Sequence, residues 1–159
     1  MTGIVQSGNV TPGHLAAWVA PGTLADGGPP LGQSETVLAQ LLGANFNTTD
    51  DQAITLPDTI TKFCLTRIIA TNASLSLTTA VGGFYPTVSK GGTSLVANTQ
   101  VYSGLTAAAS LLNPTLTSFA NTTAFTASNL TNFSIYFALT TGQGAAATAD
   151  IYLFGLILA

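Results

Sequence analysis

Few residues in this chain have side chains suited to acid–base or nucleophilic catalysis. The 159 residues include one histidine, His14, and one cysteine, Cys64. A histidine activates a cysteine or serine only from within hydrogen-bond reach. Cys64 lies in the apolar run ITKFCLTRIIA and is predicted to be a buried, inert thiol. The Gly-x-Ser-x-Gly turn that exposes a nucleophilic serine is absent from the sequence. The sequence therefore predicts a protein that is not an enzyme.

The acidic residues give little support for a metal or cofactor site. A metal site needs His, Cys or carboxylate side chains gathered in one place. Asp50 and Asp51 are adjacent and are interpreted as a turn or cap, with calcium held partly by backbone carbonyls as the alternative. Asp58 and Asp150 would serve a glycosidase only if the fold brought them together. The segment SKGGTS (89–94) lacks the spacing of a phosphate-binding loop and predicts a hairpin turn. No cofactor is predicted.

Charged residues are scarce, which restricts the partners of this protein. They make up 6% of the chain, against a usual share of about 25%. With three scattered cations and a net charge of −3, the chain is not expected to bind nucleic acid or an anionic membrane surface. Thr, Ser, Asn and Gln supply the polar surface, and they cost less to desolvate than charges do. This composition favours a subunit of an assembly, with a monomer that has a neutral, Thr-rich surface as the alternative.

The longest apolar run, IYLFGLILA (151–159), is about half the length needed to cross a bilayer. It is interpreted as a core strand that is apolar on both faces, with its outer face meeting another subunit or the N-terminal arm. The first ten residues, MTGIVQSGNV, have neither a basic region nor an apolar one, so no secretory signal is expected.

Glycine and proline recur at short intervals through residues 1–33. They predict an extended N-terminal arm with turns at 12–13, 21–22 and 26–28 and a short strand within HLAAWVA. The arm contains the single histidine, His14, and the single tryptophan, Trp18. Such a segment has little core of its own, so it must lie on another surface or move freely.

A short helix or linker is predicted over residues 34–50. Ser34 is a suitable N-cap, Leu38, Leu41 and Leu42 follow at helical spacing, and Gly43 is a suitable stop.

Residues 51–159 have the pattern of an all-β domain. Runs rich in Thr, Ile, Val, Phe and Tyr are separated by Gly, Asn and Pro, with turns predicted at 71–73, 89–92 and 141–144. In SIYFALT, Ile135, Phe137 and Leu139 alternate with the other side chains. TSLVANTQVYS and LTAAASLLNPTLTSF are also interpreted as strands. This spacing is typical of an antiparallel sandwich or barrel.

Two parts of the chain carry a resemblance to a known family. The stretch SGNVTPGHLAAWVAPGTLADGGP resembles an N-terminal segment of tailed-bacteriophage structural proteins, in which a VTPGH…W…G…DGG pattern precedes a β-rich domain. The stretches TKFCLTRIIATNASLSLTTAVGGFYPTVSKGGTSLVANTQVYSGLT and SIYFALTTGQGAAATADIYLFGLIL are similar to β domains of phage virion proteins of the head-fibre or capsid-decoration type. Together they cover most of the chain.

This resemblance implies a jelly-roll-like, homotrimeric module on the capsid surface of a virion, made in the cytoplasm of the host bacterium. Its arm would dock on the major capsid protein, so that the protein decorates or cements the shell. The residues of the docking pattern are Val10, Pro12, Gly13, His14, Trp18, Asp26, Gly27 and Gly28. Trp18 would be the main anchor, because tryptophan is favoured at interface hot spots. The alternative is an arm folded back on its own domain, with Trp18 covering the core.

A second hypothesis is a head-fibre or tail-fibre module that binds a glycan of the host surface. The aromatic residues assigned to glycan or intersubunit contact are Phe84, Tyr85, Tyr102 and Phe133. Their alternative role is packing within the core.

Overall fold

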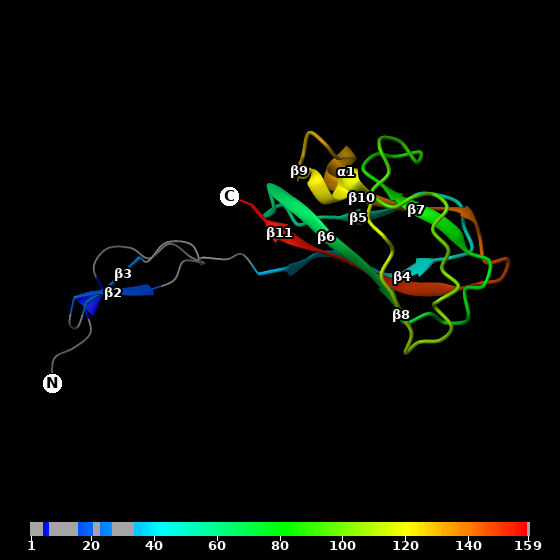
Figure 1. Cartoon of the computed structure of the whole chain (residues 1–159), viewed down its shortest axis with the longest axis horizontal. Helices are drawn as coiled ribbons and strands as arrows, with labels where there is room; N and C mark the ends of the chain where they lie inside the picture. The colour runs from blue at the N-terminus through cyan, green and yellow to red at the C-terminus, as the bar shows by residue number, and fades with distance from the viewer. Residues whose placement is uncertain (1–4, 7–15, 21–22, 27–33, 159) are drawn as a thin grey trace. The chain divides into compact units, whose positions relative to one another are not determined.

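The computed structural model of this chain describes residues 5–6, 16–20, 23–26 and 34–158 (Figure 1). The chain divides into two compact units, Met1–Ser34 and Glu35–Ala159. This boundary lies next to the one predicted after residue 33.

The first unit contains three short strands: β1 (Val5–Gln6), β2 (Ala16–Ala20) and β3 (Thr23–Asp26). They form a sheet of order β1-β3-β2, in which β2 and β3 are antiparallel and β1 and β3 are parallel. The strand predicted within HLAAWVA is therefore confirmed as β2. The segment predicted as an extended arm with turns and one short strand contains a second strand, TLAD, that pairs with AAWVA. The predicted turns at 12–13 and 21–22, and residues 27–28 of the third, lie outside the described residues.

The second unit is built from two antiparallel sheets. One has the order β5-β10-β7, formed by β5 (Gln52–Thr55), β10 (Ser134–Thr141) and β7 (Val81–Tyr85). The other has the order β4-β11-β6-β8, with β9 also paired to β6. Its strands are β4 (Thr36–Asn45), β11 (Thr148–Ile157), β6 (Lys62–Thr71), β8 (Leu111–Leu112) and β9 (Ala124–Thr126). Both sheets contribute to one hydrophobic core, so the all-β, antiparallel prediction is confirmed.

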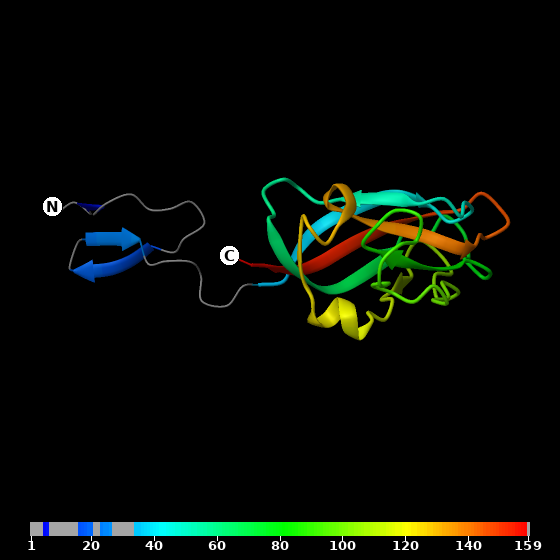
Figure 2. The ribbon, with the colours of Figure 1, turned by 90° about the horizontal axis from the view of Figure 1, so that it is seen from above.

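The central strands show why these segments form sheets. In β10, Ile135, Phe137 and Leu139 are fully buried, as their alternation predicts. Side chains on the other face of β10, such as Tyr136, are buried too, because β10 lies between two other strands and carries a second, small apolar cluster. In β11, buried and half-buried positions alternate along the strand. This strand lies between β4 and β6 (Figure 2).

The prediction of a helix or linker over residues 34–50 is wrong. Residues Thr36–Asn45 form β4, which pairs with β11 along its length. Two register shifts in this pairing move the buried positions of β4 off a strict two-residue period. The buried positions of β4 are Leu38, Ala39 and Ala44, whereas Leu42, which stands at helical spacing from Leu38, is 58% exposed. Gly43 does not stop a helix; it has a φ of 66° and its N–H donates to Asp150 at 2.8 Å.

The segment between β7 and β10 differs from the prediction in another way. The two strands expected within residues 93–119 reduce to β8 and isolated bridges. The α-helix of the second unit, α1 (Ser118–Thr122), is capped by Thr117, which accepts a hydrogen bond from the N–H of Ala120 at 3.3 Å. A short 3₁₀ turn, η1, spans Thr131–Phe133.

The three turns predicted in this unit are confirmed. Each contains residues with positive φ, namely Asn72 (54°), Ser89 (58°), Lys90 (54°), Gly92 (74°) and Gly144 (81°). Among the described residues, no helix is long and apolar enough to cross a membrane.

Candidate functional site

One edge of strand β6 is paired only in part. A polar hollow lies beside the unpaired stretch. On the side away from β11, β9 pairs with β6 at Lys62–Cys64 and β8 pairs with it at Ala70–Thr71. Residues 65–69 have no strand partner on that side. We call them the β6 gap.

Beside the β6 gap lies a hollow of ≈ 280 Å³, which we call the amide hollow. It is lined by Thr66, Arg67, Asn113, Pro114, Thr115, Leu116 and Asn121. Asn113, Thr115 and Asn121 are exposed. Among the described residues, the side-chain amides of Asn113 and Asn121 have no hydrogen-bond partner. The hollow therefore places two open amides beside Thr66 and Arg67 of β6.

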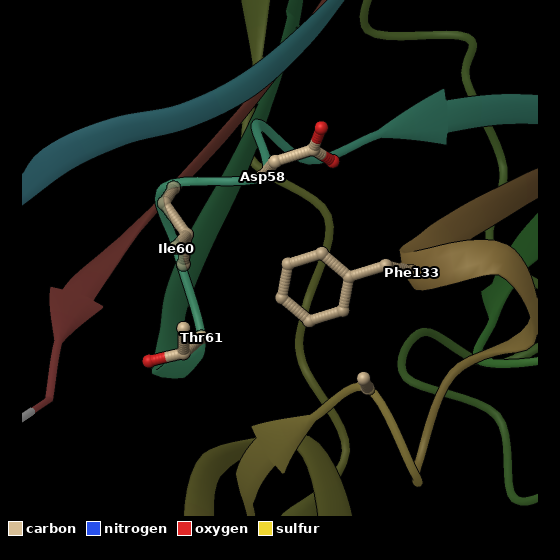
Figure 3. Close-up of a pocket in the computed structure, with 5 residues that line it drawn as sticks. Asp58, Ile60, Thr61 and Phe133 are labelled. Carbon is tan, nitrogen blue, oxygen red and sulfur yellow. The ribbon is translucent and has the colours of Figure 1, made fainter.

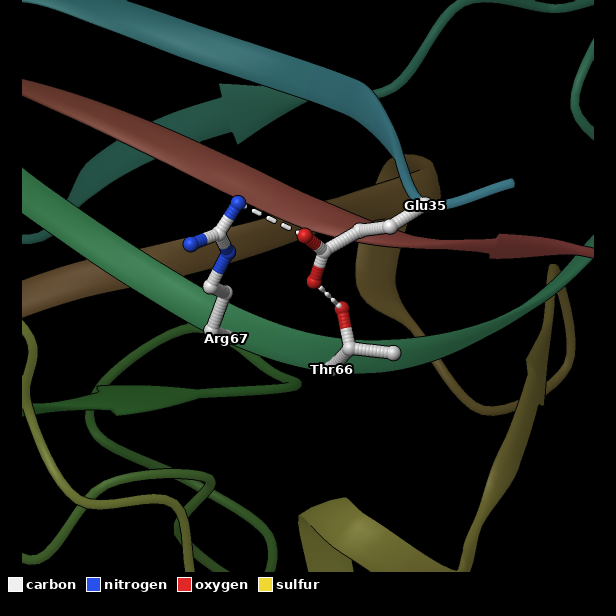
Figure 4. Close-up of polar contacts among 3 residues, drawn as sticks. All are labelled: Glu35, Thr66 and Arg67. Atoms are coloured by element: carbon white, nitrogen blue, oxygen red, sulfur yellow. Dashed lines mark hydrogen bonds and ion pairs between the residues drawn. The ribbon is translucent and has the colours of Figure 1, made fainter.

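A β-bulge directs two neighbouring side chains of β6 to one carboxylate. Arg67 pairs with Phe154 and Leu65 pairs with Gly155, which leaves Thr66 without an opposite residue on β11. The Thr66 hydroxyl donates to Oε1 of Glu35, and Nη2 of Arg67 lies 2.6 Å from Oε2 of the same residue (Figure 4). Successive residues of a regular strand point to opposite faces. The bulge explains how both reach Glu35.

The guanidinium of Arg67 is held in a fixed place. Its Cζ lies 4.5 Å from the centre of the Phe154 ring, a cation–π contact. The side chains of Arg67 and Glu35 are 42% and 33% exposed, so solvent screens their attraction. Nε of Arg67 is buried and has no hydrogen-bond partner among the described residues.

A second hollow of ≈ 270 Å³, the Phe133 hollow, is lined by Asp58, Ile60, Thr61, Ala127 and Phe133. Figure 3 shows the Phe133 ring directed toward segment 58–61, with the Asp58 carboxylate beside it. Its lining side chains are mostly apolar.

The backbone beside the Phe133 hollow is unusual. Asn132 and Phe133 have φ values of 51° and 48°, in the left-handed region that a bulky residue seldom adopts. Two hydrogen bonds hold this backbone: Leu56 N–H donates to the Phe133 carbonyl at 3.1 Å, and the Tyr136 hydroxyl to the Thr131 carbonyl at 3.2 Å. The strained conformation is thus maintained by its surroundings.

Of the four aromatic residues predicted for glycan or intersubunit contact, Phe133 alone lines a hollow described here. The prediction is wrong for Phe84 and Tyr102, which are 0% exposed. Their rings pack in the core against Phe137, at centroid distances of 5.1 and 5.8 Å. Tyr85 is 5% exposed and packs in the small cluster of β10, so it is not available for stacking either.

Two of the buried tyrosines, Tyr85 and Tyr102, have a raised pKa. Burial raises the pKa of Tyr85, and the nearby Asp51 carboxylate raises it further. Burial also raises the pKa of Tyr102, with a smaller contribution from Tyr85. The Tyr102 hydroxyl has no hydrogen-bond partner among the described residues.

The residues predicted to dock fall mostly outside the described part of the chain. Trp18 lies in β2, paired with Leu24, and Asp26 lies in β3, paired with Ala16. The remaining predicted residues, Val10, Pro12, Gly13, His14, Gly27 and Gly28, lie outside the described residues. Their docking role stays a prediction.

Among the four aspartates considered as metal or catalytic candidates, Asp50, Asp51 and Asp150 accept hydrogen bonds within the fold. Asp50 accepts a hydrogen bond from Thr48 Oγ1 at 2.9 Å, and Asp51 accepts one from the N–H of Ser89, in keeping with a turn. Asp150 pairs with Thr71 at the end of β6, whereas Asp58 precedes the start of β6, so the topology separates these two. Within the described ranges, no group of three or more His, Cys, Asp and Glu residues could hold a metal ion.

Cys64 is half-buried rather than buried as predicted. It pairs with Leu156 on β11, next to the inward-facing Phe63 and Leu65.

The sequence pattern did not predict the amide hollow. Asn113 falls in LTAAASLLNPTLTSF, which was interpreted as a strand, and Arg67 stands in an apolar run. Only the fold brings them together across some fifty positions of chain. No model of a known protein family matches this chain, and no curated protein matches it.

Proposed function

We propose that this protein is a non-enzymatic structural component of a tailed-phage virion that decorates or cements the capsid exterior. The observation that carries the proposal is the division of the chain at Ser34. A compact N-terminal unit with the VTPGH…W…G…DGG pattern is joined to a β unit with few charges. One unit would dock on the major capsid protein, and the other would form the outer module.

An apolar outer sheet face supports a role in an assembly. On β4, Val37 is 47% exposed and Leu42 is 58% exposed. On β11, Tyr152, Phe154 and Leu156 are half-buried on the face that does not enter the core. Contiguous exposed apolar surface can mark contact with other protein chains, and these residues are the part of the sheet that would supply it. We propose that this face contributes to a jelly-roll-like homotrimer.

The mechanism would be multivalent. Three N-terminal units carried by one trimer bind several neighbouring capsid subunits, and the second and third contacts are intramolecular. A protein that binds only the assembled shell stabilises that shell by mass action.

Co-sedimentation with undecorated capsids tests this proposal. Full-length protein is expected to bind saturably, and residues 35–159 are expected to remain folded by circular dichroism but not to bind. A Trp18→Ala variant of the full chain should bind more weakly by about 2 kcal/mol if Trp18 is a hot spot. Saturable binding by residues 35–159 alone would contradict the docking role of the N-terminal unit.

A further inference from the structure

We propose that the amide hollow binds one ring of a neutral saccharide. This inference does not depend on capsid docking, since it rests only on residues of the second unit.

The first argument is the hydrogen-bonding capacity left open in the hollow. Asn113 and Asn121 each present a carbonyl oxygen and an NH₂ group that have no partner among the described residues. Thr115 is exposed and adds a hydroxyl. A sugar hydroxyl donates one hydrogen bond and accepts others, which matches amides and hydroxyls.

The second argument concerns charge. Arg67 is the one charged residue among those that line the hollow, and its guanidinium is paired with Glu35 at 2.6 Å. The ion pair and the Phe154 ring also hold the guanidinium in place. A locally neutral, donor-rich wall favours hydroxyl groups over an anionic ligand, which would compete with Glu35.

Shape and rigidity provide the third argument. The volume of ≈ 280 Å³ lies at the lower end of the range for small-molecule sites, which suits one sugar ring. Leu116, which is half-buried, supplies apolar surface for the C–H face of the ring.

Residues 113–117, which line one side of the hollow, are anchored at their C-terminal end before any ligand binds. Thr117 donates to the Leu95 carbonyl through its N–H at 2.9 Å and to the Ser94 carbonyl through its hydroxyl at 2.8 Å. Leu116 forms a bridge with Val96, which is fully buried. A pre-ordered wall loses less entropy when a ligand binds.

The Phe133 hollow is the weaker candidate for a sugar. It offers an aromatic ring and the carboxylate of Asp58, but its other lining residues are Ile60, Thr61 and Ala127. In Figure 3 the Thr61 hydroxyl points away from the Phe133 ring. One carboxylate cannot satisfy the several hydroxyls of a sugar ring.

The test is an NMR titration of full-length, ¹⁵N-labelled protein, in which asparagine NH₂ groups are observed directly. The probes are the methyl glycosides of glucose, galactose, mannose and N-acetylglucosamine. Methyl glucuronide serves as an anionic probe and sorbitol as an open-chain polyol. At least one neutral glycoside is expected to shift the side-chain resonances of Asn113 and Asn121 saturably, and sorbitol is not.

Three variants locate the site. Asn113→Ala and Asn121→Ala should each weaken binding about fivefold, the effect of losing one hydrogen bond. Asn98→Ala removes another exposed asparagine amide and should leave binding unchanged. The proposal is overturned if no neutral glycoside shifts these resonances, if only the glucuronide does, or if the two variants bind as the unaltered protein does.

Discussion

The centre of the large sheet and the segment 86–117 are stabilised in different ways. In the sheet, β11 pairs with β4 on one side and β6 on the other, so its backbone is held by ladders on both sides. The segment 86–117 contains one two-residue strand, yet Leu95, Val96, Tyr102 and Leu105 are all fully buried. Figure 2 shows the loops of this green-to-yellow segment on one side of the unit. The sheet is fixed by continuous ladders of its main chain. The segment is fixed by side chains inserted into the core together with isolated backbone hydrogen bonds, such as that from the Leu95 N–H to the Phe84 carbonyl at 2.7 Å.

This difference has a functional consequence. Where the backbone is fully paired, little hydrogen-bonding capacity remains for a ligand. Where a segment is anchored by a few buried side chains, its other residues are free to face outward, and Asn113 and Thr115 do so. Loops on a rigid scaffold commonly carry binding residues for this reason.

The largest expected effect comes from filling space at the sheet centre. A Cβ on Gly155 would overlap the carbonyl oxygen of Cys64 and lie 2.6 Å from Cδ1 of Leu38. Since a backbone carbonyl in a paired strand cannot yield easily, Gly155→Ala should lower the free energy of unfolding by about 3 kcal/mol. Urea denaturation of the full chain measures this.

The matched control is Gly104→Ala, in the segment 86–117. A Cβ on Gly104 would meet only the tip of the Leu112 side chain, at 3.3 Å. Gly104→Ala should therefore change the stability by no more than about 0.5 kcal/mol. Equal losses for the two variants would contradict the contrast between the sheet centre and the segment.

Removing the buried Tyr102 hydroxyl, in the segment 86–117, should raise the stability, whereas Gly155→Ala lowers it. The Tyr102 hydroxyl is buried without a partner among the described residues, so Tyr102→Phe should raise the free energy of unfolding by about 1 kcal/mol at neutral pH. A decrease of that size would indicate a hydrogen bond, for example to a buried water.

The same variant should change the response to alkali. Burial raises the pKa of Tyr102 in the folded state. The free energy of unfolding is therefore not reduced by Tyr102 ionisation below the unfolded pKa of about 10, and it decreases as pH rises above that value, because the unfolded chain loses the proton first. Tyr102→Phe should reduce this decrease by about 1.4 kcal/mol per pH unit above that value. The pKa of Tyr85 is also raised, so the free energy of unfolding of the Tyr102→Phe variant should still decrease somewhat with pH in this range. Unfolding in urea at a series of alkaline pH values separates the two contributions.

The same contrast explains which parts of the fold could be predicted from the sequence. The period of two in SIYFALT and the turn residues at 89–92 report local geometry, and they predicted β10 and the turn that follows β7 correctly. In β4, Leu38, Leu41 and Leu42 stand at helical spacing, so the local pattern indicated a helix. The segment is a strand because it pairs with β11, which lies about a hundred positions away in the sequence. TSLVANTQVYS reads as a strand because Leu95 and Val96 are apolar, but they are buried as anchors and not in a ladder.

The candidate site was harder to predict than the fold. Arg67 and Asn121 come together only because β9 and β8 leave the β6 gap open, and strand order cannot be derived from turn signals. Aromatic residues were better guides to the core than to a surface site. Phe84 and Tyr102 are interior, since their large apolar rings stabilise most when fully buried.

The smallest expected effect concerns the ion pair beside the β6 gap, which joins the start of β4 to β6. Glu35→Gln retains a side-chain oxygen that can accept from Thr66 but removes the charge opposite Arg67. Because both side chains are substantially exposed, the loss of stability should be about 0.5 kcal/mol at low salt. It should shrink further in 1 M salt, where the screening length is about 3 Å.

Asp58→Asn is the control, since it removes an exposed carboxylate that has no ion pair among the described residues. Urea unfolding of both variants at low and high salt measures the difference. A salt-dependent loss in Glu35→Gln alone would assign the effect to the pair with Arg67. A larger loss that salt does not change would instead assign Glu35 mainly to its hydrogen bond with Thr66, and so to the geometry of the bulge that shapes the amide hollow.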